Sequence, residues 1–124
     1  MSITVGSLIL FSGTYEKSVT FYRALGLPLD GEEHGDGQVH LACDIGGVHV
    51  AVFDAKSAPA RPSSEFRSPG SSYFGFTVKN VAEVLERLRA LEAPVRQEPE
   101  MFPWGMRALV EDPDGRVIEL FARH

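Results

Sequence analysis

Two stretches of this chain repeat one another, and the repeat limits the folds that are open to it. Residues 7–29 align with residues 73–95 without a gap at a constant offset of 66 positions, so that RALGLP matches RALEAP. Further along, DIGGVHVAVF matches DPDGRVIELF at an offset of 68. The period is too long for a solenoid, and a unit of about 60 residues is marginally stable alone. We therefore expect one unit used twice, whose copies complete one core or exchange with a partner chain.

The composition favours a single domain and excludes several classes of function. With 124 residues, 44% of them apolar, the chain can bury roughly two-thirds of the surface that its unfolded form exposes. Its apolar start has no preceding cation, and no apolar run approaches the roughly 18 to 20 residues of a membrane span. The single cysteine excludes an internal disulfide, and a net charge of −5 without a cluster of Lys and Arg argues against nucleic acid. We expect a soluble cytoplasmic protein of one domain, made of module 1–54, linker 55–72 and module 73–124.

Each half reads as a strand, a helix and then further strands. In the first half, Thr14 is placed to cap a helix whose apolar residues recur at three-residue steps until Gly26 ends it. In the second half, Asn80 and Glu83 form a capping-box-like start, and the helix continues until Pro94. Its apolar face consists of Val81, Val84, Leu85, Leu88 and Leu91.

A hairpin closes each half. Gly46 and Gly47 separate strand-like residues 39–43 and 48–53, as residues 113–115 separate 106–110 from 117–121. The run DGEEHGDG reads as an acidic turn in which His34 is solvated. The linker, rich in Ala, Ser, Pro and Gly, is expected at the surface, either as a lid or as a hinge without further function.

Alternation along the strands sorts their residues by face. If Leu8 and Leu10 lie under the first helix, the polar or odd-sized residues of four strands face away from the helices. These residues are Ser7, Ile9, Phe11, His49, Ala51, Phe53, Tyr73, Gly75, Val117, Glu119 and Phe121. Such a mixed polar and aromatic face either lines a ligand cavity or is exposed to solvent without binding a ligand.

The residues now described resemble the vicinal oxygen chelate superfamily, which includes glyoxalase I, extradiol dioxygenases, fosfomycin-inactivating transferases and bleomycin-resistance proteins. The likeness rests on the duplication, on the helix ending in FYRALGLPL and on the hairpin WGMRALVEDPDGRVIELFA, and it covers nearly the whole chain. It implies an α+β fold in which two tandem βαβββ modules form a cupped, incomplete β-barrel with the helices on its outer face. It also implies a small-molecule ligand in the cavity and assembly as a homodimer.

The resemblance further implies where a metal would bind. Metalloenzymes of the superfamily use one residue on the first and last strand of each module, and here those positions hold Ser7, Ala51, Tyr73 and Glu119. Only Glu119 is a competent ligand, because a serine hydroxyl and a neutral phenol bind divalent ions poorly and alanine offers no donor. A displaced site from His49 and Glu119 would have too few ligands, and His40 is expected to point to the opposite face. We therefore expect no metal and no other cofactor.

An aromatic cluster precedes the last hairpin. Phe102 and Trp104 flank a proline and are followed by Gly105, and bleomycin-resistance proteins carry a similar Pro-Trp-Gly at this place. The two rings would stack on a flat ligand at the mouth of a cleft, or Trp104 closes the core or a dimer contact.

The family pattern suggests that Arg107 and Leu109 of the last hairpin face the cup. Arg107 then pairs with Glu119 or with a ligand anion, or it is exposed. Glu119 either accepts a hydrogen bond from Tyr73 or Ser7 or contacts the ligand.

The expected function is that of a metal-free binding protein of the bleomycin-resistance type, which sequesters an aromatic or glycopeptide antibiotic. Nucleophilic catalysis lacks support, because Ser7 has no obvious histidine base and Cys43 has no neighbouring cation in the sequence. The alternative is an enzyme, either a metal-dependent lyase or dioxygenase with atypical ligands or a metal-free isomerase or cyclase in which Glu119 or Tyr73 moves a proton. The candidate ligand-binding residues are Ser7, Ile9, His49, Ala51, Tyr73, Phe102, Trp104, Arg107, Leu109 and Glu119.

Overall fold

The computed structural model describes residues 2–33, 39–56 and 66–124, which belong to two compact units. Unit 1 is Met1–Ala60 and unit 2 is Arg61–His124. Unit 1 contains β1 (Ser7–Ser12), α1 (Tyr15–Leu25), β2 (Asp30–Glu33), β3 (Val39–Ile45) and β4 (Val48–Asp54). Unit 2 contains β5 (Phe74–Thr77), α2 (Val81–Arg89), β6 (Val95–Phe102), β7 (Gly105–Glu111) and β8 (Val117–Arg123).

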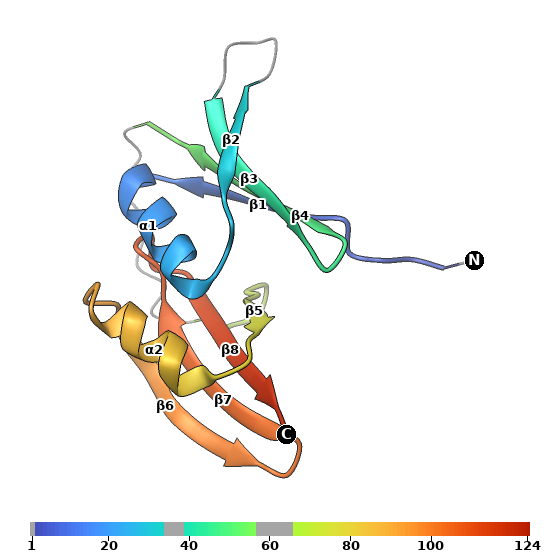
Figure 1. Ribbon diagram of the computed structural model, residues 1–124, viewed down its shortest axis with the longest axis vertical. Coiled ribbons are helices and arrows are strands. Elements are labelled where there is room, and N and C mark those ends of the chain that lie inside the picture. The colour runs from blue at the N-terminus through green and yellow to red at the C-terminus, as the bar shows by residue number, and fades with distance from the viewer. Residues whose placement is uncertain (1, 34–38, 57–65) are drawn as a thin grey trace. The chain divides into compact units, whose positions relative to one another are not determined.

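The two units share one topology, which can be followed in Figure 1. The strand order is β1-β4-β3-β2 in the sheet of unit 1, called sheet A, and β5-β8-β7-β6 in that of unit 2, called sheet B. In each sheet the first strand runs parallel to the last, and the remaining pairs are antiparallel. The expected α+β fold with two βαβββ modules is confirmed. Neither of the sheets formed by the described residues closes into a barrel.

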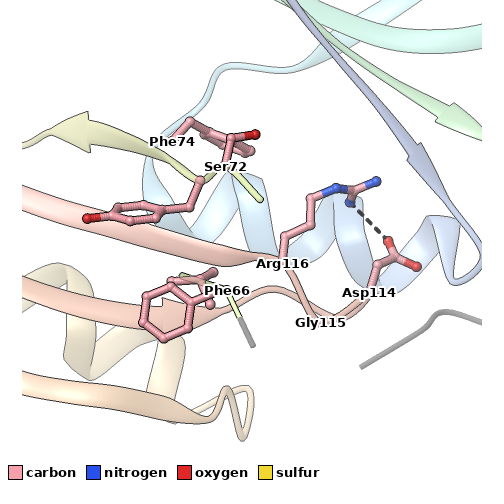
Figure 2. Close-up of a pocket in the computed structure, with 8 residues that line it drawn as sticks. Phe66, Ser72, Phe74, Asp114, Gly115 and Arg116 are labelled. Atoms are coloured by element: carbon pink, nitrogen blue, oxygen red, sulfur yellow. Dashed lines mark hydrogen bonds and ion pairs between the residues drawn. The ribbon is translucent and has the colours of Figure 1, made fainter. Parts of the chain in front are cut away.

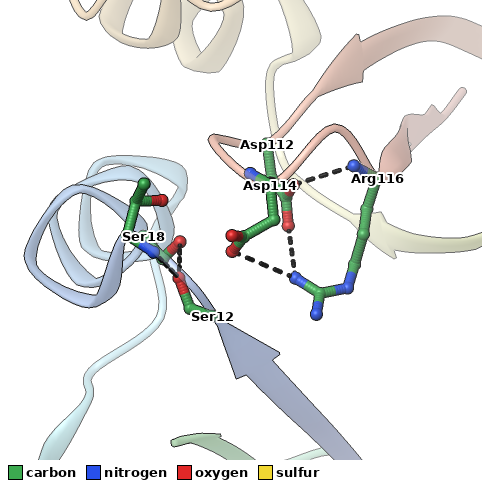
Figure 3. A network of polar contacts seen from close by, with 6 residues as sticks. Ser12, Ser18, Asp112, Asp114 and Arg116 are labelled. Carbon is green, nitrogen blue, oxygen red and sulfur yellow. Dashed lines mark hydrogen bonds and ion pairs between the residues drawn. The ribbon is translucent and has the colours of Figure 1, made fainter. Parts of the chain in front are cut away.

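Helix α1 begins after Thr14 and ends at Gly26, as expected. Thr14 makes no side-chain cap bond; instead its backbone N–H donates to Ser12 Oγ at 3.0 Å. Ser12 Oγ also lies 2.7 Å from the hydroxyl of Ser18 on the first turns of the helix (Figure 3). Gly26 ends the helix with a φ of +130°, a conformation that side-chain-bearing residues rarely adopt.

Helix α2 begins as expected but ends earlier. Asn80 Oδ1 accepts a hydrogen bond from the backbone N–H of Glu83 at 3.0 Å, which satisfies one free donor of the first turn. The expected extension to Pro94 is wrong, because the helix ends at Arg89 and Glu92 turns the chain with a φ of +62°. Leu91 therefore leaves the apolar face and is 42% exposed, whereas Leu88 is fully buried.

The loops follow the glycines of the sequence, with one correction. Gly46 and Gly47 have φ values of +56° and +80°, as the two central residues of a tight β3–β4 hairpin turn require. The first half of the expected acidic turn is instead strand β2, whose Asp30 is paired with Ala42 of β3. Pairing at a sheet edge overrides the acidic composition there. His34 lies outside the described residues.

Each unit buries apolar residues between its helix and its sheet. In unit 1, Phe21 and Tyr22 of α1 are buried, as are Val50 and Val52 of β4. In unit 2, the fully buried residues are Leu88, Ala108, Val110, Ile118 and Leu120. Within the described ranges, the chain has no helix with the length and apolar character that crossing a membrane requires.

Candidate ligand-binding surface

Each sheet has one face on its helix and one face that points away from it, which we call the open face. Residues paired directly across neighbouring strands share a face. In sheet A, Ile9 is paired with Ala51, and in sheet B, Leu109 is paired with Glu119. The expected alternation is thus observed on both sheets. The open faces carry all ten candidate residues except Phe102 and Trp104, which lie at the end of the β6–β7 hairpin.

His40 is a correction to the expected arrangement. It is buried and stacks on Phe53, with 4.1 Å between ring centroids and 19° between planes, so it lies on the open face. The cause is hairpin length. Two residues connect β3 to β4 and five connect β7 to β8, and this odd difference shifts the register of β3 by one position. Because Ala42 faces Ala51 as Leu109 faces Glu119, His40 is the unit 1 counterpart of Arg107.

The open face of sheet A is mainly aromatic. Phe11 stacks on Phe53 at 5.6 Å and 29°, so that with His40 three rings follow one another across β1, β4 and β3. Alternation along the strands predicted that Phe11 and Phe53 lie on this face, although neither was among the candidate ligand-binding residues.

A histidine does lie beside Ser7, contrary to expectation. Ser7 is paired with His49 in the parallel β1–β4 ladder, and Ala51 follows on the same strand with 1% of its surface exposed. His49 Nδ1 lies 2.8 Å from Asp44 Oδ1 on β3. Ser7 and His49 lie side by side only because β1 pairs with β4, a strand distant from it in the sequence.

The centre of the open face of sheet B is a polar cluster of Tyr73, Arg107 and Glu119. Arg107 Nε lies 3.1 Å from Glu119 Oε2 in an ion pair, and Arg107 Nη2 donates to Tyr73 Oη at 3.3 Å. The side chains of Arg107 and Glu119 are 24% and 28% exposed. Of the alternatives left open for Arg107, the pair with Glu119 is the one observed.

A glycine makes room for this cluster. Gly75 is paired with Glu119, and a Cβ atom on it would lie 2.7 Å from Glu119 Cβ. Such a distance is shorter than real Cβ contacts allow, so β5 approaches β8 this closely only with glycine at position 75.

Glu100 adds a second carboxylate that the sequence did not indicate. It is paired with Arg107 across β6 and β7, and it accepts a hydrogen bond from Gln97 at 3.2 Å. The register of β6 shifts twice between residues 95 and 100. Strict alternation along the strand therefore cannot predict that Glu100 is paired with Arg107.

The aromatic end of sheet B lies at the β6–β7 hairpin. Phe102 and Trp104 are stacked, with 5.2 Å between centroids and 9° between planes. Trp104 is 63% exposed, so the alternative in which it closes the core is wrong. The Phe121 ring lies against Gly105, and Gly105 is paired with Phe102. Phe121 is itself paired with Arg107, so its ring extends the aromatic surface toward Arg107.

Cys43 is not arranged as a nucleophile. Burial raises the pKa of its thiol above the ordinary 9.0, and the neighbouring Asp44 carboxylate raises it further. The reactive thiolate is therefore disfavoured at neutral pH.

Comparison with known proteins places the chain among glyoxalase-like folds. The sequence model of the family described as "Glyoxalase/Bleomycin resistance protein/Dioxygenase superfamily" matches residues 4–120. No curated protein matches the chain.

Solved structures resemble it over nearly the full length. SMU.1112c is 26% identical, with 96% of this chain and 98% of that one covered and a TM-score of 0.73. A glyoxylase/bleomycin resistance protein/dioxygenase domain from Frankia sp. EAN1pec is 17% identical, with both chains covered completely and a TM-score of 0.72. A glyoxalase-related enzyme from Fulvimarina pelagi is 22% identical, with 97% and 88% covered and a TM-score of 0.71. The last two likenesses concern the fold alone.

Proposed function

Because the chain belongs to the glyoxalase/bleomycin resistance protein/dioxygenase superfamily and holds a guanidinium against both Tyr73 and Glu119, we propose that it is a metal-free small-molecule binding protein. It acts in the cytoplasm and sequesters an aromatic or glycopeptide antibiotic without altering it. The contact of Arg107 with both residues is the observation that carries this proposal.

The residues at the superfamily's metal positions do not fit a divalent ion. In unit 2, Tyr73 and Glu119 already share the Arg107 guanidinium, and a metal beside this cation would be repelled. In unit 1, Ala51 has no donor atom and Ser7 offers only a hydroxyl. Within the described part of the chain, no group of three His, Cys, Asp or Glu side chains could hold a metal ion.

Sheet B offers the groups that binding without catalysis requires. The stacked Phe102 and Trp104 present a flat apolar surface for a planar ring. Phe121 connects that surface to Arg107, so polar substituents of the same ligand can meet the charged cluster. A ligand pocket typically combines mainly aromatic contacts with a few fixed polar groups, and this surface has that composition.

Metal content gives the first test. Protein purified without chelator is expected to contain well under one equivalent of Zn, Ni, Mn or Fe by elemental analysis, and EDTA should leave its melting temperature unchanged. One equivalent of any of these metals would refute the proposal and would make His49 and Glu119 the first ligands to mutate.

Ligand binding gives the second test. Trp104 is the single tryptophan, so daunorubicin or bleomycin bound at this surface should change its fluorescence saturably and be recovered intact. By calorimetry, Trp104→Ala should weaken binding by roughly 1 to 3 kcal/mol, the usual cost of losing a stacked anchor. Leu91→Ala, at another exposed apolar residue of unit 2, is the matched control and should leave affinity unchanged.

Glu119→Gln separates binding from catalysis. In a binding protein it should change affinity modestly, mainly for cationic ligands. If a probe is instead converted to a product, and Glu119→Gln lowers that turnover by at least about a hundredfold while binding persists, the protein is an enzyme.

A further inference from the structure

Unit 2 contains a pocket of about 140 Å³ beside the polar cluster (Figure 2). It lies between residues 72–74, which lead into β5, the loop that joins β7 to β8, and Phe66 from the end of the linker. Its lining residues are Phe66, Ser72, Tyr73, Phe74, Asp114, Gly115, Arg116 and Val117.

One wall of the pocket is aromatic and held in place. Phe66 meets Tyr73 edge to face, with 5.7 Å between centroids and 70° between planes. The guanidinium groups of Arg67 and Arg96 lie 4.8 and 4.9 Å from the Phe66 ring centroid, and Arg96 is itself bound to Glu111 at 2.7 Å. These contacts fix Phe66 against sheet B by cation–π and ring–ring attraction.

The opposite wall is polar and rigid (Figure 3). The fully buried Asp112 side chain, behind this wall, accepts hydrogen bonds from the backbone N–H groups of Asp114 and Arg116, both at 2.9 Å, and from Arg116 Nη1 at 3.0 Å. Arg116 Nη1 also lies 3.5 Å from Asp114 Oδ2, and the Asp114 side chain is 6% exposed. Asp114 and Arg116 themselves line the pocket, so a carboxylate held beside a guanidinium faces the aromatic wall.

We propose that this pocket binds a compound with one aromatic ring that carries a hydroxyl or amino group. A cavity of ~150 Å³ holds a benzene molecule, so the volume suits one ring. The aromatic wall contacts the ring, while a hydroxyl or ammonium group donates to the Asp114 carboxylate.

The pocket is distinct from the surface around Trp104, and its occupancy does not depend on the proposed function. The two share only Tyr73, whose ring lines the pocket while its hydroxyl accepts a hydrogen bond from Arg107. A spectroscopic change at Tyr73 would therefore report on both sites. A change at Gly115 reports on the pocket alone, and a change at Trp104 reports on the surface around Trp104 alone.

Amide chemical shifts measured with phenol and benzylamine test the assignment. Both probes should move the amide signals of Ser72, Gly115 and Arg116 saturably. Saturable shifts confined to residues around Trp104, or no saturable shift at these three amides, would overturn the proposal.

Three variants complete the test. Phe66→Ala removes the aromatic wall and should weaken phenol binding at least about tenfold. Leu91→Ala changes an exposed apolar residue outside the pocket and should leave phenol binding unchanged. Asp114→Asn should weaken benzylamine binding more than phenol binding, because only the amine is a cation at neutral pH. Unchanged phenol binding in Phe66→Ala would show that the probe does not occupy this pocket.

Discussion

Arg107 determines which partners the centre of sheet B accepts. Its guanidinium contacts both Glu119 and the Tyr73 hydroxyl. Tyr73 and Glu119 stand at the two metal-ligand positions of unit 2, so this cation occupies the place between them. Alternation and the family resemblance placed both residues on the same face and gave the pair with Glu119 as one of three alternatives for Arg107. They could not predict the bond to Tyr73, because it depends on how closely β5 approaches β8, and one glycine controls that distance.

Replacing Gly75 with alanine tests this control. Alanine in a strand is ordinarily favoured over glycine by roughly 0.5 to 1 kcal/mol, because glycine loses more backbone freedom on folding. Here the added Cβ would lie 2.7 Å from Glu119 Cβ, so we expect Gly75→Ala to lower the free energy of unfolding by roughly 1 to 3 kcal/mol, as overpacking does. Urea denaturation measures the change.

Gly6→Ala is the control for that experiment, because a Cβ at Gly6 would meet no atom within 4 Å. Equal unfolding midpoints for Gly75→Ala and the unmodified protein would mean that β5 can move away from β8 without cost.

The strands show how far a repeat in the sequence predicts a repeat in structure. The offset of 68 correctly matched β4 with β8, but β3 corresponds to β7 at an offset of 67, because the two hairpin loops differ by an odd number of residues. This single-residue shift moved His40 to the open face. Loop length was visible in the sequence, but where each loop began was not, since Asp44 and Ile45 continue β3 beyond the apolar run.

Because α2 ends at Arg89, truncating two leucines of the same apolar pattern should lower the free energy of unfolding by different amounts. Leu88 is fully buried, so Leu88→Ala should lower the free energy of unfolding by roughly 2 to 5 kcal/mol through lost burial and a cavity. Leu91 lies beyond the helix and is 42% exposed, so Leu91→Ala should cost under about 1 kcal/mol. Thermal denaturation of both variants makes the comparison. Similar losses would mean that α2 extends past Arg89 in solution.

The two units keep one topology but differ in the chemistry of their open faces. Sheet A carries mainly stacked rings, with His49 beside Asp44. Sheet B carries the ion pairs of Arg96 with Glu111 and of Arg107 with Glu119, and its stacked rings lie at the β6–β7 hairpin. The repeated sequence predicted the shared topology, because helix caps, glycine turns and apolar periodicity recur in both halves. It did not predict the difference between the faces, because each contact depends on which residues the strand register places opposite one another.

Assembly follows from the size of the units and from their edges. A unit of about 60 residues buries only about 60% of the surface that its unfolded chain exposes, which makes it marginally stable alone. In addition, β1 and β5 each lie at an edge of their own sheet. We propose that the chain forms a homodimer with an isologous interface, which would cover these edges and exposed apolar side chains such as Ile9. Light scattering at micromolar concentration should then give twice the chain mass. The urea midpoint should also rise with protein concentration, because dissociation accompanies unfolding in such dimers. A monomer mass together with a midpoint independent of concentration would refute the dimer, and the ligand surface would then have to be complete within a single chain.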